Sequence, residues 1–288
     1  MKYGINEVMD CLEVAFDRKK ILLQLAGIAL SSAVVVLFSW LGGLAAPGLP
    51  ANALNLTGAL VAAAIMAVFL TAICRMAYKE LTVGEKISPK EALEFSKSNI
   101  LSLLLTPVVL AASAGAVFLL QYAIFLLGRF SLVQVAISVF SAPVLVLNAV
   151  MILALGAGSL FIYPVIAVDE SGPFKSSRKI LTVVLYAPAK LLAGVTLSAL
   201  MGIPVILSLA GILFTANILT ISMFGSASGI FEAMKHTEIP FIPATTYAAW
   251  SVFLVSLSVL SGAVLSYALV YTKTAAVSIY LSMKNSLK

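Results

Sequence analysis

Charged side chains are the scarcest feature of this sequence. Asp, Glu, Lys and Arg make up 10% of the 288 residues, whereas about a quarter is usual for a soluble domain. Hydrophobic residues make up 61%, and the mean hydropathy is +1.10. A chain of this composition cannot cover its surface with polar groups, so we expect lipid to be its solvent. The composition excludes a soluble globular protein.

Cysteine, histidine and phosphate-binding motifs are also scarce. Cys11 and Cys74 are the two cysteines and form no CxxC pair, which argues against a disulfide framework or a cysteine-based zinc site. The glycines form neither a GxGxxG nor a GxxxxGK motif. We therefore expect neither a metal nor a cofactor.

Long apolar runs are what the sequence has instead. A helix needs about 20 apolar residues to cross the hydrocarbon core of a bilayer. Six runs meet this length, at residues 21–44, 54–76, 101–127, 133–168, 191–214 and 248–271. We predict an all-α polytopic membrane protein with six transmembrane helices, in which residues 1–288 form a single transmembrane domain.

The basic residues predict the orientation of these spans. All of the 18 Lys and Arg residues except Arg129 and Lys235 fall on one side of the predicted membrane. Basic residues accumulate on the cytoplasmic side, so the pattern predicts a multi-pass protein of the cell (plasma) membrane with both termini in the cytoplasm. The same pattern explains the net charge of +6, and we expect no nucleic acid as a partner. The acidic residues before Ile21 favour an uncleaved first span over a signal peptide.

Short amphipathic segments precede the odd-numbered spans. In the first, Ile5, Val8, Leu12 and Phe16 recur at helical spacing. The second opens with Ser88-Pro89-Lys90-Glu91, in which Ser at the N-cap and Glu three residues later are typical of a capping box. The third opens with Ser171-Gly172-Pro173. We predict three interfacial helices on the cytoplasmic side.

These segments also indicate an internal repeat. The junctions between surface helix and span read AFDRKKIL, EFSKSNIL and KSSRKIL, with Ile21, Ile100 and Ile180 spaced by about 80 residues. The pattern predicts three parallel-repeat hairpins, each with a cytoplasmic interfacial helix, a span out and a span back, over residues 1–80, 81–168 and 169–288. Inverted repeats of the kind found in many carriers are not predicted.

Two segments resemble a known group of proteins. One contains Gly84, Glu85, Lys86, Ser88, Glu91, Ala92 and Leu93. The other is the apolar strip and acidic pair from Pro164 to Glu170, followed by Ser176-Ser177. Both segments are similar to the membrane domain attached to some glycerophosphoryl diester phosphodiesterases and to related uncharacterised bacterial and archaeal six-span families. The chain departs from that pattern at Phe174-Lys175 and has no phosphodiesterase domain, so the resemblance implies membrane integration and no hydrolase activity.

Polar residues inside the spans are the first candidates for a functional site. They are Gln24, Gln121, Asn148 and Asn217, which either line a solute path or form hydrogen bonds between helices. Ionisable residues are missing from the apolar segments except for Arg75 and Arg129 near their ends, which argues against a proton antiporter or pump.

The second candidate is the outer loop at residues 224–247. Glu232 and His236 are four residues apart and Glu238 follows, so a helix would bring two metal-ligand types to one face. A metal site usually needs three or four ligands, and we favour a structural or solvated role for these residues.

Proline and glycine are predicted to interrupt two spans. Pro143, Gly156, Gly158 and Pro164 fall in the fourth, and Gly202 and Pro204 fall in the fifth. Breaks of this kind line transporter cavities, but kinks and close helix packing use the same residues, and we favour that interpretation. The basic residues of the surface helices are explained by topology alone, and binding of anionic lipid headgroups is a further interpretation.

From these features we expect a non-enzymatic membrane protein that binds lipids or partner membrane proteins, including a second copy of itself. The alternative is a channel or facilitator for a small or hydrophobic solute. An enzyme is not expected because the apolar core lacks acid–base residues.

Overall fold

The computed structural model describes residues 4–44, 48–126, 143–144, 147–148, 151, 155–156, 159–227 and 244–286. These residues form helices joined by short connections, which confirms the predicted all-α class. The helices are α1 (Ile5–Ala15), α2 (Arg18–Leu44), α3 (Leu49–Val83), α4 (Pro89–Ser98), α5 (Ile100–Leu126), α7 (Pro173–Tyr186), α8 (Pro188–Ala227) and α10 (Ala244–Ser286). A further helical segment, Ser159–Asp169, ends just before α7.

Three of the helices are short, and each directly precedes a long one. Helix α1 leads into α2, α4 into α5, and α7 into α8, with one or two residues between them. The Ser88 Oγ accepts a hydrogen bond from the Glu91 N–H at 3.2 Å, which confirms the predicted N-cap of α4. At α7, Pro173 occupies the first turn after Gly172. These are the start signals that the sequence provides.

Within the described residues, five helices are long and apolar enough to cross a membrane. They are Arg18–Leu44, Leu49–Val83, Ile100–Leu126, Pro188–Thr215 and Ser261–Lys284. Five of the six predicted spans overlap these helices. Most of the predicted fourth span, residues 133–168, lies outside the described residues, and its described end is the 11-residue helix Ser159–Asp169.

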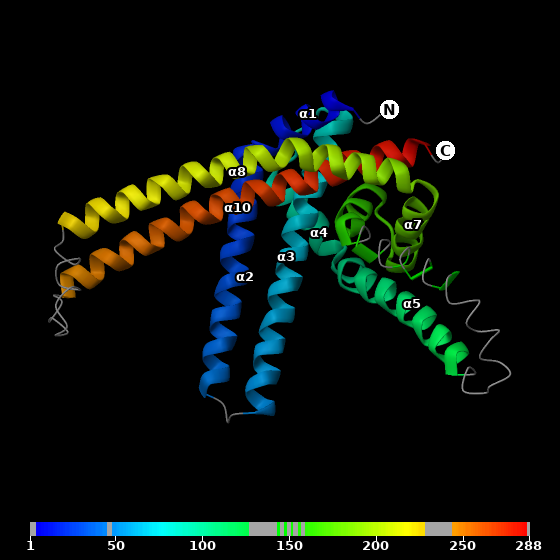
Figure 1. Ribbon diagram of the computed structural model, residues 1–288, viewed down its shortest axis with the longest axis horizontal. Coiled ribbons are helices and arrows are strands. Elements are labelled where there is room, and N and C mark those ends of the chain that lie inside the picture. The colour runs from blue at the N-terminus through cyan, green and yellow to red at the C-terminus, as the bar shows by residue number, and fades with distance from the viewer. Residues whose placement is uncertain are drawn as a thin grey trace.

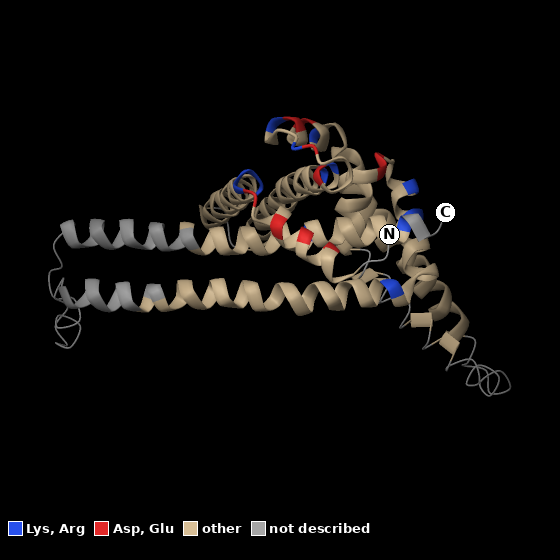
Figure 2. Ribbon diagram, turned by 90° about the horizontal axis from the view of Figure 1, so that it is seen from above, with Lys and Arg blue, Asp and Glu red and all other residues tan. Residues whose placement is uncertain are grey.

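The long helices extend outward from one region, where the short helices lie (Figure 1). Helices α2 and α3 form one antiparallel pair, α8 and α10 form another that packs across it, and α5 extends in a third direction. We call the region where they meet the hub: α1, α4, α7, Ser159–Asp169 and the adjoining ends of α2, α3, α5, α8 and α10. The described Lys, Arg, Asp and Glu residues gather at the hub, and the outer lengths of the long helices lack them (Figure 2).

Two apolar clusters form the interior of the hub. One joins α3, α5, Ser159–Asp169, α7, α8 and α10, and is centred on residues such as Val165, Ile166, Ile180 and Val277. The other joins α1, α2, α3, α4 and α10. Because α3 and α10 contribute to both clusters, these two helices hold the hub together.

Glycine permits the closest contacts between long helices. A Cβ at Gly27 of α2 would lie 2.7 Å from the ring of Phe69 in α3, and a Cβ at Gly202 of α8 would overlap the ring of Tyr271 in α10. The chain is not interrupted at Gly202 and Pro204, since α8 is one continuous helix from Pro188 to Ala227, and the close contact at Gly202 agrees with the favoured helix-packing interpretation. Gly202 serves helix packing there. Pro164 likewise lies within the helix Ser159–Asp169.

Candidate functional site

A cavity lined by charged and polar side chains lies at the hub and has a volume of about 420 Å³. Three segments contribute to it: α7, the end of the helix Ser159–Asp169, and the last turns of α10. We call it the basic pocket, and its lining residues are Asp169, Lys175, Arg178, Lys179, Thr182, Val183, Tyr280 and Lys284.

Helix α7 places its basic residues on one face. Lys175, Arg178, Lys179 and Thr182 are spaced by three, one and three residues, so they follow one side of the helix. The opposite side is buried by Ser176, Ser177, Ile180, Val183 and Val184.

Two serine side chains fix the buried side of α7. The Ser176 Oγ donates to the Ser171 carbonyl at 3.0 Å, and the Ser177 Oγ bonds to the Pro173 carbonyl at 2.8 Å. Ser177 also lies 3.4 Å from the carbonyl of Thr106 in α5. With this side held against α5, Lys175 and Arg178 are turned outward and are exposed.

Asp169 organises the floor of the pocket. Its side chain is 5% exposed and pairs with Lys179 at 2.8 Å, with Lys284, and with the hydroxyl of Tyr280. Burial alone would raise the pKa of this carboxyl, but the hydrogen bonds from Lys179, Lys284 and Tyr280 hold the pKa below its ordinary value. Asp169 is therefore a fixed anion that joins three segments.

The other two cations of the pocket form no ion pair with a described carboxylate. Lys175 and Arg178 have no carboxylate partner within the described part of the chain. The described lining holds four cations against the single carboxylate of Asp169, so the pocket has a net charge of +3. Exposed Lys and Arg side chains with this excess charge are suited to binding an anion, and Arg binds phosphate through two parallel hydrogen bonds.

Aromatic residues flank the basic face of α7. Phe174 and Tyr186, near the two ends of the helix, are 75% and 76% exposed. Aromatic side chains are enriched where proteins meet the headgroup region of a bilayer. Helix α7 therefore exposes aromatic rings at its ends and cations between them.

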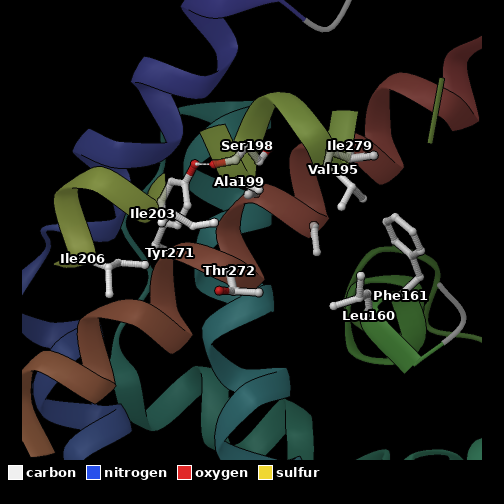
Figure 3. Close-up of a pocket in the computed structure, with 12 residues that line it drawn as sticks. Leu160, Phe161, Val195, Ser198, Ala199, Ile203, Ile206, Tyr271, Thr272 and Ile279 are labelled. Atoms are coloured by element: carbon white, nitrogen blue, oxygen red, sulfur yellow. Dashed lines mark hydrogen bonds between the residues drawn. The ribbon is translucent and has the colours of Figure 1, made fainter. Parts of the chain in front are cut away.

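A second cavity, of about 200 Å³, lies between α8, α10 and the helix Ser159–Asp169 (Figure 3). Its walls are mostly apolar and include Leu160, Phe161, Val195, Ile203, Ile206 and Ile279. The hydroxyl of Tyr271 donates to the Ser198 carbonyl at 2.6 Å, so this polar group is satisfied within the wall. The ring of Phe161 also packs 6.4 Å from the ring of Tyr280, which lines the basic pocket. The two cavities thus share one aromatic contact.

Other ion pairs of the hub connect helices. Lys20 of α2 pairs with Glu80 of α3 and donates to the Val14 carbonyl at 2.9 Å. Arg75 of α3 pairs with Glu170 at 2.7 Å. Because these groups are already paired, we assign them a structural role.

Of the polar residues predicted within the spans, Gln24, Gln121 and Asn148 line neither cavity. Gln24 is buried in α2, where its amide contacts the Met66 sulfur at 4.0 Å, and Gln121 is buried in α5. The Gln24 Oε1, Gln121 Nε2 and Asn148 Oδ1 atoms have no hydrogen-bond partner among the described residues. The side chain of Asn217 and all of Glu232, His236 and Glu238 lie outside the described residues.

Metal-ligand types do not gather in the described part of the chain. No group of three or more His, Cys, Asp or Glu side chains there could hold a metal ion. Cys11 and Cys74 are both buried free thiols. Burial raises the pKa of the Cys11 thiol to about 11.

No family model matches this sequence, and the searches of curated proteins and of solved structures return no match.

Sequence reasoning missed the basic pocket because topology already explained its cations. Two signals were present: the spacing of Lys175, Arg178 and Lys179 places them on one helical face, and Asp169 ends an apolar strip. What the sequence could not indicate is that α10 returns to this point and adds Tyr280 and Lys284.

Proposed function

We propose that this chain is a non-enzymatic multi-pass membrane protein that binds anionic lipid at the basic pocket. The proposal depends on Lys175 and Arg178, two exposed cations that pair with no described carboxylate. They lie on α7, which exposes an aromatic ring near each end and sits where the long apolar helices meet. Each Lys or Arg near an anionic bilayer surface contributes about 1 kcal/mol to lipid attraction. The neighbouring apolar cavity is suited to hydrocarbon, which supports a lipid over a soluble anion.

The proposal includes a topology. Six spans form three parallel-repeat hairpins, and the hub and both termini lie on the cytoplasmic side of the plasma membrane. The gathering of charged residues at the hub supports this orientation, because basic residues accumulate on the cytoplasmic side. The order of a short helix before each of α2, α5 and α8 supports the repeat. Reporter fusions after Lys97 and Lys190 test the topology, and a reporter on the outer side at either position would contradict it.

A non-enzymatic role is supported by the chemistry of the pocket. Its carboxyl group, Asp169, is held by three partners and has a lowered pKa, so it is a weak base. Recognition of a charged group needs only the cations, whereas proton transfer needs a group that titrates near the working pH.

Lipid binding is tested with the full chain in a neutral detergent. Native mass spectrometry measures the retention of added dioleoyl phosphatidylglycerol and dioleoyl phosphatidylcholine. We expect the anionic lipid to remain bound at concentrations at which the zwitterionic lipid dissociates, with a preference that weakens as salt is added. Equal retention of the two lipids would contradict the proposal.

A facilitator for a small or hydrophobic solute is the second candidate. It is favoured by the buried amide atoms of Gln24 and Gln121 that lack partners within the described residues. Proteoliposomes loaded with the chain should then swell in glycerol or urea faster than empty liposomes. A Gln24→Leu variant that swells at the wild-type rate would remove Gln24 from the proposed path.

A further inference from the structure

The four cations of the basic pocket differ in whether they pair with a carboxylate. Lys179 and Lys284 share the carboxylate of Asp169, whereas Lys175 and Arg178 stand free of any carboxylate in the described part of the chain. Two positive charges are therefore available to a ligand without breaking an existing pair, and a third is only partly neutralised. This excess of positive charge determines which anions the pocket can bind.

Lipid headgroups differ in the charge that they offer. A phosphodiester headgroup carries one negative charge, and a zwitterionic headgroup carries none in net. A phosphomonoester carries between one and a half and two negative charges near pH 7, because its second ionisation lies at a pH of about 6, and it presents three terminal oxygens. Two uncommitted cations match such a dianion, since Arg can contact two of its oxygens and Lys a third.

We infer that the basic pocket binds the terminal phosphomonoester of a lipid, with Lys175 and Arg178 contacting the phosphate. This inference rests on the proposed lipid-binding function and specifies its headgroup class. A soluble phosphomonoester offers the same chemistry. The lipid source is favoured because Phe174 and Tyr186 expose apolar rings beside the cations, and because Phe161, in the wall of the apolar cavity, contacts Tyr280.

The Asp169 carboxylate determines which cations are available to the ligand. It lies at the floor of the pocket with its side chain 5% exposed, and it anchors Lys179 from α7 and Lys284 from α10. Because those two lysines are already paired, the attraction for a ligand comes mainly from Lys175 and Arg178 at the rim. The attraction of these cations grows with the negative charge of the ligand, so a dianion gains more than a monoanion.

Displacement of an acyl-labelled fluorescent phosphatidate from the full chain in neutral detergent tests the inference. The competitors are unlabelled dioleoyl phosphatidate, dioleoyl phosphatidylglycerol and inorganic phosphate at pH 7.5. We expect phosphatidate to compete at a concentration at least fivefold lower than phosphatidylglycerol, and 10 mM inorganic phosphate to leave the probe bound.

Equal potency of the two lipids would overturn the monoester assignment and leave the broader lipid-binding proposal standing. Displacement by phosphate alone would overturn the lipid source. Failure of the labelled phosphatidate to bind at all would overturn both proposals.

The dependence on pH gives a second readout. The charged groups that face the site are Lys175, Arg178 and Lys179 from α7, Lys284 from α10 and Asp169, with the phenol of Tyr280 beside them. Lysine, arginine and tyrosine side chains ordinarily titrate well above pH 8, and the lowered pKa of Asp169 keeps it ionised at pH 5. A change between pH 7.5 and pH 5 therefore reports on the phosphate. The preference for phosphatidate should vanish at pH 5, and a preference that persists there would contradict the inference.

Matched variants separate this pocket from general surface charge. The double variant Lys175→Ala/Arg178→Ala should weaken phosphatidate binding about 25-fold at low salt, or roughly fivefold for each cation. The control, Lys90→Ala/Lys97→Ala, removes the same charge from exposed positions of the short helix α4 and should change binding less than twofold. Equal losses in the two variants would show that the protein attracts lipid through its overall charge, and would overturn the site.

Discussion

Asp169 is the residue at which three segments of the chain meet. It ends the helix Ser159–Asp169, receives Lys179 from α7, and receives both Tyr280 and Lys284 from α10. A carboxylate that is this buried costs desolvation energy, and its charged partners offset that cost. Removing the charge of Asp169 should destabilise the hub more than removing any one of its three partners.

We predict that Asp169→Asn lowers the free energy of unfolding by about 1–3 kcal/mol at pH 7, because it leaves two lysines unpaired. Thermal unfolding in neutral detergent measures the effect. Since the pKa of Asp169 is lowered in the folded protein, its contribution is fully present above the ordinary carboxyl value of about 3.9 and disappears as the pH falls through the lower folded value. The difference between wild type and variant should thus be constant from pH 7.5 to 5 and shrink below pH 4. A difference that disappears by pH 5.5 would contradict this assignment.

Cys11 supplies a second residue-scale prediction. Its thiol lies in α1 with the sulfur 4.0 Å from the Thr274 carbonyl of α10, and its pKa of about 11 leaves about one thiol in a thousand ionised at pH 8. Since the thiolate is the reactive form, iodoacetamide should modify Cys11 at pH 8 at least a hundredfold more slowly in the folded protein than after denaturation in SDS. Peptide mass spectrometry measures both rates. Comparable rates would mean that α1 does not cover this side of α10.

Residues of the candidate site were only partly predictable from sequence. Lys175, Arg178 and Lys179 are visible as one helical face, but the cytoplasmic bias of basic residues accounts for them equally well. Asp169 gains its significance from Lys284, which is 115 residues away. Local sequence carries no information on such a pair, so the pocket emerges only once α10 is placed against α7.

At the scale of elements, prediction succeeded where the signal is local. The cap at Ser88 and the long apolar runs correspond to helices in the structure. At Gly202 and Pro204 the sequence left a cavity-lining break and close helix packing as alternatives, and the chain continues as a helix there. Proline removes one backbone donor but fits a helix whose neighbours compensate, and the glycine accommodates a ring of the adjacent helix. Sequence alone cannot separate these uses from a break.

The contact between α8 and α10 depends on that glycine. We predict that Gly202→Ala destabilises the protein by about 1–3 kcal/mol, because the added Cβ would overlap the ring of Tyr271 and displace its hydroxyl from the Ser198 carbonyl. Thermal unfolding in detergent measures the change.

Gly211 provides the control within the same helix. A Cβ at Gly211 would meet nothing within 4 Å, so Gly211→Ala should be neutral or slightly stabilising, because alanine favours helix over glycine. If Gly202→Ala were as stable as Gly211→Ala, α8 and α10 would not pack as described.

At the scale of the whole molecule, the α2–α3 pair, the α8–α10 pair and α5 meet at the hub. The composition predicts that they are apolar and long, and the charges predict which ends gather. Neither predicts which helix contacts which, because lipid-facing surfaces look alike along the chain. Several of the specific contacts are made by polar groups that join segments far apart in sequence, and Arg75 is one of these groups.

Arg75 connects α3 to two other segments. Its guanidinium donates to the Ala167 carbonyl at 2.8 Å, pairs with Glu170 at 2.7 Å and lies 4.2 Å from the ring centroid of Phe95 in α4. Lysine keeps the charge but has neither the fork that serves two acceptors nor the plane that stacks on a ring. We predict that Arg75→Lys costs about 1–3 kcal/mol of unfolding free energy in detergent.

Lys79, one turn further along α3, serves as the matched control. It has no charged or hydrogen-bonded partner in the described part of the chain. Lys79→Gln should therefore leave the unfolding temperature unchanged. This variant removes a positive charge, whereas Arg75→Lys retains one. Suppose instead that Lys79→Gln lowers the unfolding temperature more than Arg75→Lys does. Overall charge, and not the specific contacts of Arg75, would then stabilise the hub. The proposed pocket, which depends on the same assembly of segments, would then lose its structural basis.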